Sequence, residues 1–376
     1  MAGIYIHIPF CSQRCSYCDF YTRVAPRQID ETVNAIVREI ALRHSYLKNE
    51  PIQTIYFGGG TPSLLTANQF SRIFEQLYAF FSVNEDAEIT FEANPDDLTP
   101  AFFESIIDLP FNRISIGIQS FDDAQLKLIN RRHTGLEAIQ AVQNARNAGF
   151  YNLSVDLIYG LPTQSLESWE MQLEKAFELN SEHISAYGLT YEEGTPLHKQ
   201  RELGRITSAG DADMIEMHKL MLRKMEEAGY EAYEISNFAK PGLRSQHNSA
   251  YWKMTPYLGL GPSAHSYDGN SRQWNVSSIK LYNQAVADGS NFFESEQLSL
   301  NEKYNEYIMV ALRTKEGVQT NYLSKHFGKG YLEKFNAATQ KYIDVNCLVV
   351  IDNYVALTLN GILISNLIIE DCMVIS

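Results

Sequence analysis

Three cysteines close to the N-terminus are the residues whose type and spacing most directly predict chemistry. Cys11, Cys15 and Cys18 follow a short apolar stretch, residues 3–8, at C-x3-C-x2-C spacing. Thiolates placed this way on one loop can hold three corners of an iron–sulfur cube. A [4Fe–4S] cluster held by only three cysteines has one iron without a protein ligand, and that iron is free to bind and activate a small molecule.

Two other interpretations of the cysteines stay open at this point. A structural zinc site takes four ligands, and no second cysteine pair follows the motif. His7 would be available to complete a site, although a histidine within a strand is equally a hydrogen-bonded core residue. The remaining interpretation is three buried thiols without a metal. The preference of thiolates for iron–sulfur clusters and zinc favours the cluster.

The composition restricts the class of protein. The 376 residues carry a net charge of −14 with a pI near 5.1, which argues against electrostatic binding to nucleic acid or to an anionic membrane. Five cysteines occur, and Cys347 and Cys372, outside the motif, are typical of buried thiols. We therefore expect a reducing, cytoplasmic compartment. The sequence predicts no transmembrane segment, and because a strand is expected from residue 3 we expect no signal or transit peptide.

Six short β-rich segments alternate with amphipathic helical segments. The expected strands are residues 3–8, 52–57, 87–92, 113–118, 153–157 and 183–187. This alternation is typical of consecutive βαβ units, and six units fall short of a closed eight-unit barrel. We therefore expect an α/β fold built on a partial (β/α)6 TIM-like barrel, open enough for a large substrate. We place the barrel at residues 1–190, a barrel extension at 191–299 and a C-terminal domain at 300–376.

Glycine and polar residues follow several of the expected strands. Gly58–Gly60 follow the second strand, Glu92 ends the third, Gln119 follows the fourth, and Asp156 lies near the end of the fifth. Taken singly, the glycines are typical of a tight turn and each polar residue of a helix cap or a surface group. Because ligands of parallel α/β folds bind at the carboxyl ends of the strands, together they predict one site with the cysteines. Close backbone approach at the glycines and hydrogen bonds from Glu92, Gln119, Arg131 and Asp156 suit a ligand that carries ammonium, carboxylate or ribose groups.

The cysteine motif, with the aromatic Tyr17 before its last cysteine, resembles that of the radical S-adenosylmethionine (SAM) superfamily. The superfamily's glycine-rich methionine-binding motif is matched by Gly58-Gly59-Gly60-Thr61-Pro62. A finer pattern resembles the oxygen-independent coproporphyrinogen III oxidase family over nearly the whole chain. It consists of Tyr-x-His-x-Pro-Phe-Cys at residues 5–11, Phe-Gly-Gly-Gly-Thr-Pro at 57–62, Ile-Gly-Ile-Gln-Ser-Phe at 116–121 and Asp-Leu-Ile-Tyr-Gly-Leu-Pro at 156–162.

The resemblance implies that the open iron is chelated by the amino and carboxylate groups of SAM. Reduction of the cluster would then cleave SAM to methionine and a 5′-deoxyadenosyl radical. Cys11, Cys15 and Cys18 would be the cluster ligands. The positions expected to bind SAM by this resemblance are Tyr5, Tyr17, Gly59, Gly60, Thr61, Glu92, Gln119, Arg131 and Asp156. In the oxidases, some of these positions contact a second SAM molecule.

Three features resemble the heme-chaperone (HemW) branch of this family rather than the oxidases. The oxidases carry a further cysteine where this chain has Phe20, and they have a longer segment before the first strand. His247-Asn-Ser-Ala-Tyr251-Trp252 is an H-N-x-x-Y-W motif that the resemblance links to heme handling. A neutral imidazole is a good axial ligand for heme iron, so we predict His247 as that ligand, with Tyr251 and Trp252 stacked on the porphyrin. A structural histidine in a loop is the alternative, and His265 is a weaker ligand candidate that we expect to line the pocket.

The resemblance therefore implies a heme chaperone that binds heme, a [4Fe–4S] cluster and SAM, and that transfers heme to an acceptor hemoprotein. The acceptor is not identified by the sequence, although a respiratory hemoprotein is a candidate, and the cluster would need an electron donor. The alternative is an oxygen-independent coproporphyrinogen III oxidase, a radical SAM oxidative decarboxylase of porphyrin biosynthesis, or another radical enzyme. A zinc-bound scaffold without redox chemistry is the third hypothesis.

The hydrophobic pattern changes after residue 300. We expect helices at 302–312, 320–326 and 331–343, two apolar strands at 348–351 and 354–357 around an Asp-Asn turn, and a last helix from residue 359. This order resembles a small winged-helix module. Lys and Arg do not outnumber Asp and Glu in residues 301–376, so the basic surface of a nucleic-acid reader is missing. We therefore interpret the module as a lid or a docking surface.

Overall fold

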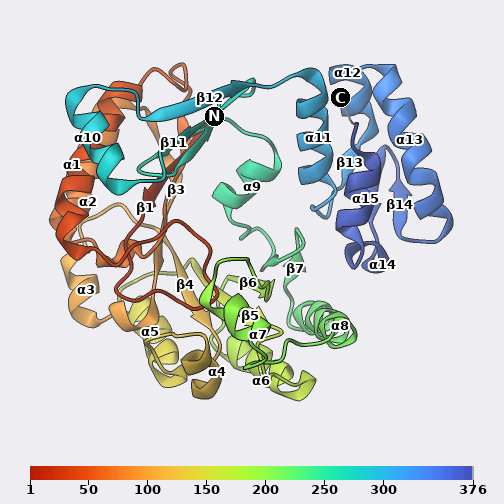
Figure 1. Cartoon of the computed structure of the whole chain (residues 1–376), viewed down its shortest axis with the longest axis horizontal. Helices are drawn as coiled ribbons and strands as arrows, with labels where there is room; N and C mark the ends of the chain where they lie inside the picture. The colour runs from red at the N-terminus through yellow and green to blue at the C-terminus, as the bar shows by residue number, and fades with distance from the viewer. Residues whose placement is uncertain (375–376) are drawn as a thin grey trace.

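The structure, a computed structural model, describes residues 1–374 and contains two main hydrophobic cores that lie next to each other along its longest axis (Figure 1). The larger core lies between a sheet of twelve strands and the helices that cover it. The smaller core lies within residues 304–372. Within the described part of the chain, no helix is long and apolar enough to cross a membrane.

Six parallel strands form the centre of the large sheet, in the order of the chain. They are β1 (Ala2–Ile8), β2 (Ile52–Gly59), β3 (Val83–Ala93), β4 (Arg113–Gln119), β5 (Leu153–Tyr159) and β6 (His183–Gly188). Each strand pairs in parallel with the next. The central residues of most of these strands are buried, as expected for a parallel sheet that is covered by helices. The predicted partial (β/α)6 barrel is therefore confirmed.

Helices on the outer face return the chain from each strand to the next. They are α1 (Ile29–Arg43), α2 (Ala67–Phe80), α3 (Pro100–Ser105), α4 (Asp123–Leu128), α5 (Gly135–Asn147) and α6 (Leu166–Glu178), with short 3-10 helices η1 (Pro26–Gln28), η2 (Pro62–Leu64) and η3 (Pro95–Asp97). Helix α2 shows how they are attached. Its start is fixed by a capping box between Thr66 and Gln69, and its Phe70 and Phe74 rings pack against Phe57 of β2.

The segment after β6 extends the sheet at both ends. Helices α7 (Pro196–Glu202) and α8 (Asp211–Glu227) precede β7 (Glu231–Ala232) and β8 (Asn237–Ala239), and β8 pairs antiparallel with β6. Helix α9 (Gln246–Trp252) then leads to β9 (Tyr257–Leu260), which pairs in parallel with β1 at the opposite end. Antiparallel β10 (His265–Tyr267), β11 (Ser271–Asn275) and β12 (Phe293–Gln297) complete the sheet, with α10 (Ile279–Asp288) between β11 and β12.

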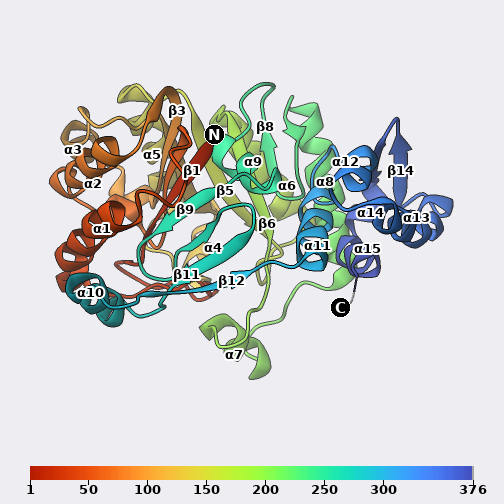
Figure 2. The same cartoon turned by 90° about the horizontal axis from the view of Figure 1, so that it is seen from above.

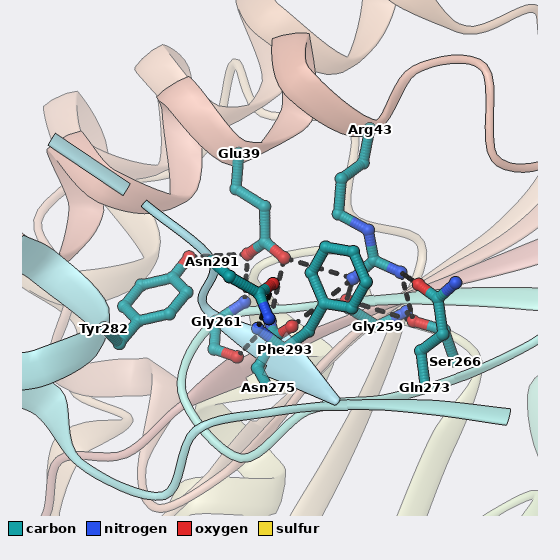
Figure 3. Close-up of polar contacts among 10 residues, drawn as sticks. All are labelled: Glu39, Arg43, Gly259, Gly261, Ser266, Gln273, Asn275, Tyr282, Asn291 and Phe293. Carbon is teal, nitrogen blue, oxygen red and sulfur yellow. Dashed lines mark hydrogen bonds and ion pairs between the residues drawn. The ribbon is translucent and has the colours of Figure 1, made fainter. Parts of the chain in front are cut away.

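A buried ion pair on α1 joins the first helix to this extension (Figure 3). Glu39 is fully buried, and its carboxylate accepts hydrogen bonds from the Gly261 backbone at 2.8 Å and the Tyr282 hydroxyl at 2.5 Å. Arg43, 6% exposed, donates to Glu39 at 3.2 Å and to Gln273 at 2.7 Å. The further partners are Gly259, Ser266 and Asn275. Because both charged groups are surrounded by hydrogen-bond partners, the pair fixes α1 against β9–β11 and α10.

The C-terminal module has the winged-helix-like order that the sequence predicts. Helices α11 (Leu300–Ala311), α12 (Thr320–His326) and α13 (Lys329–Asp344) precede a hairpin of β14 (Leu348–Ile351) and β15 (Tyr354–Leu357), which pairs with β13 (Val318–Gln319). Helices α14 (Leu359–Ile362) and α15 (Ser365–Cys372) end the described chain. Figure 2 shows the module at the end of the molecule away from α1–α3, beyond α8 and α9. Its α11 packs against α9, and Arg272 of β11 pairs with Glu306 of α11.

Several predicted boundaries differ from the structure. The third strand begins at Val83 rather than at residue 87, because its first residues are polar and partly exposed and so lack an apolar pattern. The last predicted helix is two short helices, α14 and α15. Strands β7–β12 had not been predicted, since they are short and rich in polar and aromatic residues. The domain boundaries at residues 190 and 299 stay predictions.

Candidate cofactor site

A cavity of about 560 Å³ opens at the carboxyl ends of the six parallel strands. Every one of these strands, or the loop that follows it, contributes to its wall. The predicted residues that line it are Cys11, Cys15, Cys18, Tyr17, Gly59, Gly60, Thr61, Glu92, Gln119, Arg131 and Asp156. The structure therefore brings together the cysteines and the strand-end residues, as expected if they form one site.

The cysteine loop is attached to the rest of the protein at the start and in the middle of the motif. At its start, Cys11 N donates to Arg23 O at 3.1 Å. In its middle, Ser16 N donates to Ile129 O at 3.0 Å, and Ser16 O accepts from Leu197 N at 2.8 Å. These bonds connect the loop to the segments after β1, α4 and β6, so the three thiols are held at the cavity although the loop has almost no regular secondary structure.

Two side chains donate hydrogen bonds to the cysteine sulfurs. The Thr61 hydroxyl lies 3.5 Å from Cys11 Sγ, and Arg131 Nη1 lies 3.4 Å from Cys15 Sγ. Burial raises the pKa of the Cys11 thiol, and it raises the pKa of Cys18 to about 11. Donors at the sulfurs favour the thiolate form that a metal requires. The site therefore has soft ligands and partners that stabilise their charge.

The structure places the candidate metal ligands of the sequence analysis. Among the described residues, no group of three or more His, Cys, Asp or Glu side chains is arranged to hold one metal ion. His7 is a core residue: its Nδ1 bonds to the Tyr5 hydroxyl and its Nε2 to the Tyr21 carbonyl, both at 3.0 Å. Three separate thiols around a cavity are instead the donor set that fits an iron–sulfur cluster with an open iron.

The glycine segment after β2 requires residues without a side chain. Gly59 has φ of +106°, and a Cβ on it would lie 2.4 Å from the His7 ring. A Cβ on Gly60 would lie 2.5 Å from the Phe10 carbonyl oxygen, where the chain enters the cysteine loop. The segment therefore packs directly against β1 and exposes its backbone to the cavity.

Glu92 and Asp156 are two buried carboxyl groups in the cavity wall. Glu92 Oε1 accepts from the Tyr56 hydroxyl at 2.8 Å, and its Oε2 accepts from Gly59 N at 3.1 Å. Burial raises the pKa of Glu92 to about 7, and the nearby Asp156 adds to the rise. Burial also raises the pKa of Asp156, whose carboxylate accepts from the Ser115 hydroxyl at 3.2 Å. These carboxylates suit a ligand that brings amino or hydroxyl donors.

The comparisons with known proteins agree with this site. Residues 5–176 match the model of the radical SAM superfamily, and residues 298–364 match that of the HemN C-terminal domain. The chain is 33% identical over 369 residues to the heme chaperone HemW of Bacillus subtilis, which covers 97% of both proteins. It is 35% identical over 84% of its length to a mouse protein named radical S-adenosyl methionine domain-containing protein 1, mitochondrial, of which 74% is covered.

The chain belongs to the HemW family of the radical SAM superfamily. A radical SAM protein contains a [4Fe–4S] cluster and binds SAM, and the donor set described above fits both. The fold is shared with the coproporphyrinogen III oxidase HemN of Escherichia coli, with a TM-score of 0.86 at 23% identity over 99% of this chain and 90% of that one.

Two predicted cofactor residues of this HemW-family chain do not line the cavity. Tyr5 lies behind the cavity wall. Its ring stacks on Tyr56, and its hydroxyl forms a hydrogen bond with Nδ1 of His7. His247, on α9, is 2% exposed. Its Nδ1 lies 2.8 Å from Thr54 Oγ1 and its Nε2 lies 3.0 Å from the Tyr251 hydroxyl. Both ring nitrogens therefore have partners in this conformation, and burial, which lowers the pKa to about 3, keeps the ring neutral.

His265 is exposed, with its ring stacked on Trp274, and it is not among the residues that line the cavity in this HemW-family chain. Conversely, sequence reasoning missed Asn94 and Tyr187, which do line it. Asn94 Nδ2 donates to Thr61 Oγ1 at 3.2 Å. Both missed residues lie at strand ends: Asn94 follows the last residue of β3, and Tyr187 is the second-to-last residue of β6. That position was the signal that could have identified them.

Proposed function

We propose that this chain is a heme chaperone that holds a [4Fe–4S] cluster on Cys11, Cys15 and Cys18, binds SAM in the adjoining cavity and passes heme to an acceptor hemoprotein. The observation that carries the proposal is the likeness, along nearly the full length of both chains, to a relative named heme chaperone HemW. The cysteine loop and the strand-end residues line the same cavity, and this supports the cofactor part of the proposal.

The residues of the cavity have complementary roles in this proposal. The bound cluster supplies a one-electron reductant and an iron that is open to SAM. The backbone at Gly59 and Gly60 lets the ligand approach closely, while Glu92 accepts hydrogen bonds from its amino or hydroxyl groups. Gln119, the last residue of β4, and Asp156, within the neighbouring strand β5, bind the remaining polar groups.

The heme part of the proposal places the heme at α9. The predicted axial ligand is His247, and its Nε2 would have to exchange its hydrogen bond with the Tyr251 hydroxyl for the heme iron. Helix α9 packs against both β2 and α11, so the proposed heme site lies where the barrel meets the C-terminal module. That position suits transfer, because the module adds a surface on which an acceptor can dock. A respiratory hemoprotein is our candidate acceptor.

The experiment is anaerobic reconstitution followed by titration with hemin. We expect a Soret shift with the wild type, a weaker shift with His247→Ala, and an unchanged shift with the control His265→Ala, whose imidazole lies on β10 and stacks on Trp274 rather than on α9. Loaded protein should then pass heme to apomyoglobin, followed by the myoglobin spectrum. Wild-type protein that takes up no hemin would contradict the proposal.

An oxygen-independent coproporphyrinogen III oxidase is the second candidate, favoured by the cysteine loop and the cavity that faces it. An anaerobic assay with coproporphyrinogen III, SAM and dithionite separates the two. Protoporphyrinogen together with 5′-deoxyadenosine would support the oxidase. Deoxyadenosine without a porphyrin product would point to radical chemistry on another substrate.

A further inference from the structure

Asn94 lies where β3 passes into the short helix η3, and its side chain does not cap that helix. An asparagine at the start of a helix usually turns its side-chain oxygen to the first backbone N–H groups. Here Asn94 lines the cavity, and its amide forms hydrogen bonds with two other cavity residues, Thr61 after β2 and Arg131 after α4. The amide therefore serves the cavity rather than the helix.

A chain of hydrogen bonds runs through this amide to a cysteine sulfur. Arg131 Nη2 donates to Asn94 Oδ1 at 2.8 Å. Asn94 Nδ2 donates to Thr61 Oγ1 at 3.2 Å, and the Thr61 hydroxyl lies 3.5 Å from Cys11 Sγ. Residues from three separate loops of the barrel thus meet at one of the three thiols.

The donors and acceptors in this chain have a defined direction. A guanidinium can only donate, so the atom of Asn94 that faces Arg131 is the oxygen, and the amide nitrogen faces Thr61. The amide hydrogen occupies a lone pair of Thr61 Oγ1, and the hydroxyl hydrogen of Thr61 is left for Cys11 Sγ. Asn94 therefore determines which way the Thr61 hydroxyl points.

We propose that Asn94, oriented by Arg131, is a positioning residue of the cluster, which directs the Thr61 hydroxyl to Cys11 Sγ and thereby raises the reduction potential of the cluster. This inference rests on the cluster of the proposed function. It is compatible with ligand binding by Arg131, because Nε of that side chain has no hydrogen-bond partner among the described residues and stays available as a donor.

The direction of the effect follows from charge. Reduction adds one electron from a chemical reductant such as dithionite to a 2+ cluster and gives a 1+ cluster, without the transfer of a proton or the breaking of a bond. Hydrogen bonds to the sulfurs are among the factors that set the potential of such clusters. A donor at Cys11 Sγ stabilises the more negative, reduced form, so a Thr61 hydroxyl that turns away from this sulfur makes reduction harder.

The variant Asn94→Asp tests this role, because it is similar in size and still accepts from Arg131 but cannot donate to Thr61. Its second oxygen offers the Thr61 hydroxyl another acceptor and draws it away from Cys11. The added negative charge also lowers the potential. Thr61→Val separates the two effects, since only the effect of the charge remains when the hydroxyl is absent.

The full chain is reconstituted anaerobically as wild type, Asn94→Asp, Thr61→Val, the double variant and the control Asn112→Ala. Asn112 also bonds to β3, to Ile89 N and Ala87 O at 2.8 Å each, but it is not among the residues that line the cavity. Iron and sulfide are measured first, then the midpoint potential of the SAM-free cluster by an EPR-monitored dithionite titration. We expect Asn94→Asp to shift the potential to more negative values, by more with Thr61 present than with Val in its place, and Asn112→Ala to leave it unchanged.

Equal shifts from Asn94→Asp in the two backgrounds would overturn the inference, since the amide would then not act through the Thr61 hydroxyl. The same result is expected if Asn94 only contacts SAM, because the titration contains none. If Asn94→Asp does not retain the cluster, Asn94→Ala in the same two backgrounds decides in the same way. Wild-type protein without iron and sulfide would overturn the proposed function instead, so the two failures are distinguishable.

Discussion

The hydroxyl of Tyr56 donates a 2.8 Å hydrogen bond to Oε1 of Glu92, so a side chain from β2 fixes the orientation of the carboxylate at the end of β3. The Tyr56 ring also contacts His247, whose ring stacks on it with centroids 4.9 Å apart. One tyrosine therefore connects the cavity wall with the H-N-x-x-Y-W motif on α9. A change in the position of α9 would therefore be transmitted through this contact to Glu92 in the proposed SAM site.

Replacing Tyr56 with Phe tests this relationship, because the ring still stacks but the donor is lost. A hydrogen bond to a charged group contributes about 1.5–3 kcal/mol, and about 1.4 kcal/mol is tenfold in affinity. We therefore expect SAM to bind at least about tenfold more weakly to reconstituted Tyr56→Phe, measured by isothermal titration calorimetry. Tyr78→Phe, an exposed tyrosine on α2, should bind like the wild type. Equal affinities would show that the orientation of Glu92 does not matter for SAM.

The raised pKa of Glu92 predicts a pH dependence of SAM binding. Because burial raises this pKa to about 7, the carboxyl is largely protonated in mildly acidic solution and is then a poorer acceptor. SAM affinity should increase as the pH rises from about 6 to about 8, with at most a tenfold change per pH unit for one proton. The SAM affinity of Glu92→Gln should lack this increase with pH. A wild-type profile that is flat over the same range would argue against Glu92 as a SAM ligand.

The same carboxyl should affect the stability of the ligand-free protein in the opposite sense. Its pKa is raised from 4.5 to about 7 in the folded protein, so the folded state binds this proton more tightly than the unfolded state. Stability contributed by Glu92 is therefore lost as the pH rises from 4.5 to about 7. Glu92→Gln should raise the Tm, relative to the wild type, more above this range than below it. A Tm difference between the two proteins that is the same below and above this pH range would contradict the raised pKa of Glu92.

Gly60 offers a test of how closely the glycine segment must pack on the cysteine loop. In Gly60→Ala, the new Cβ would lie 2.5 Å from the Phe10 carbonyl oxygen and 2.8 Å from that of Ile8. The end of β1 would have to shift, so we expect less iron and sulfide per chain after reconstitution and a lower Tm. Gly330→Ala on α13 is the control, since its Cβ meets nothing within 4 Å. Iron content equal in both variants would mean that the loop tolerates the displacement.

The cavity residues were predictable because the chemistry of a parallel barrel collects at its strand ends. Glu92 and Gln119 lie at the ends of apolar runs and Asp156 lies within one, and their common edge follows from strand order. His247 shows the limit of such reasoning. Its contact with Thr54 joins residues separated by 193 positions, and it depends on α9 and β9 returning to the β1–β2 edge of the sheet. No local pattern encodes that return, so the motif and the residue type suggested an accessible ligand.

Glu39 and Arg43 show the same limit for charged residues. Their i, i+4 spacing on a helix is typical of a solvent-exposed ion pair. They are buried because β9–β11 and α10 cover this face of α1, and the strands of the extension are too short and too polar to be predicted from periodicity. Burial of the pair is thus a property of the assembled sheet.

That burial predicts a large effect on stability. Removing one partner of a buried ion pair leaves an uncompensated charge and costs about 3–5 kcal/mol, whereas an exposed pair contributes about 1 kcal/mol or less. We expect the free energy of unfolding of Glu39→Ala, from urea titration followed by circular dichroism, to fall by about 3–5 kcal/mol. Glu216→Ala is the matched control, because its pair with Lys219 has side chains that are 58% and 53% exposed. If the free energy of unfolding falls by the same small amount in both variants, the network around Glu39 does not hold the extension to α1. In that case β9 must be retained by its pairing with β1 alone.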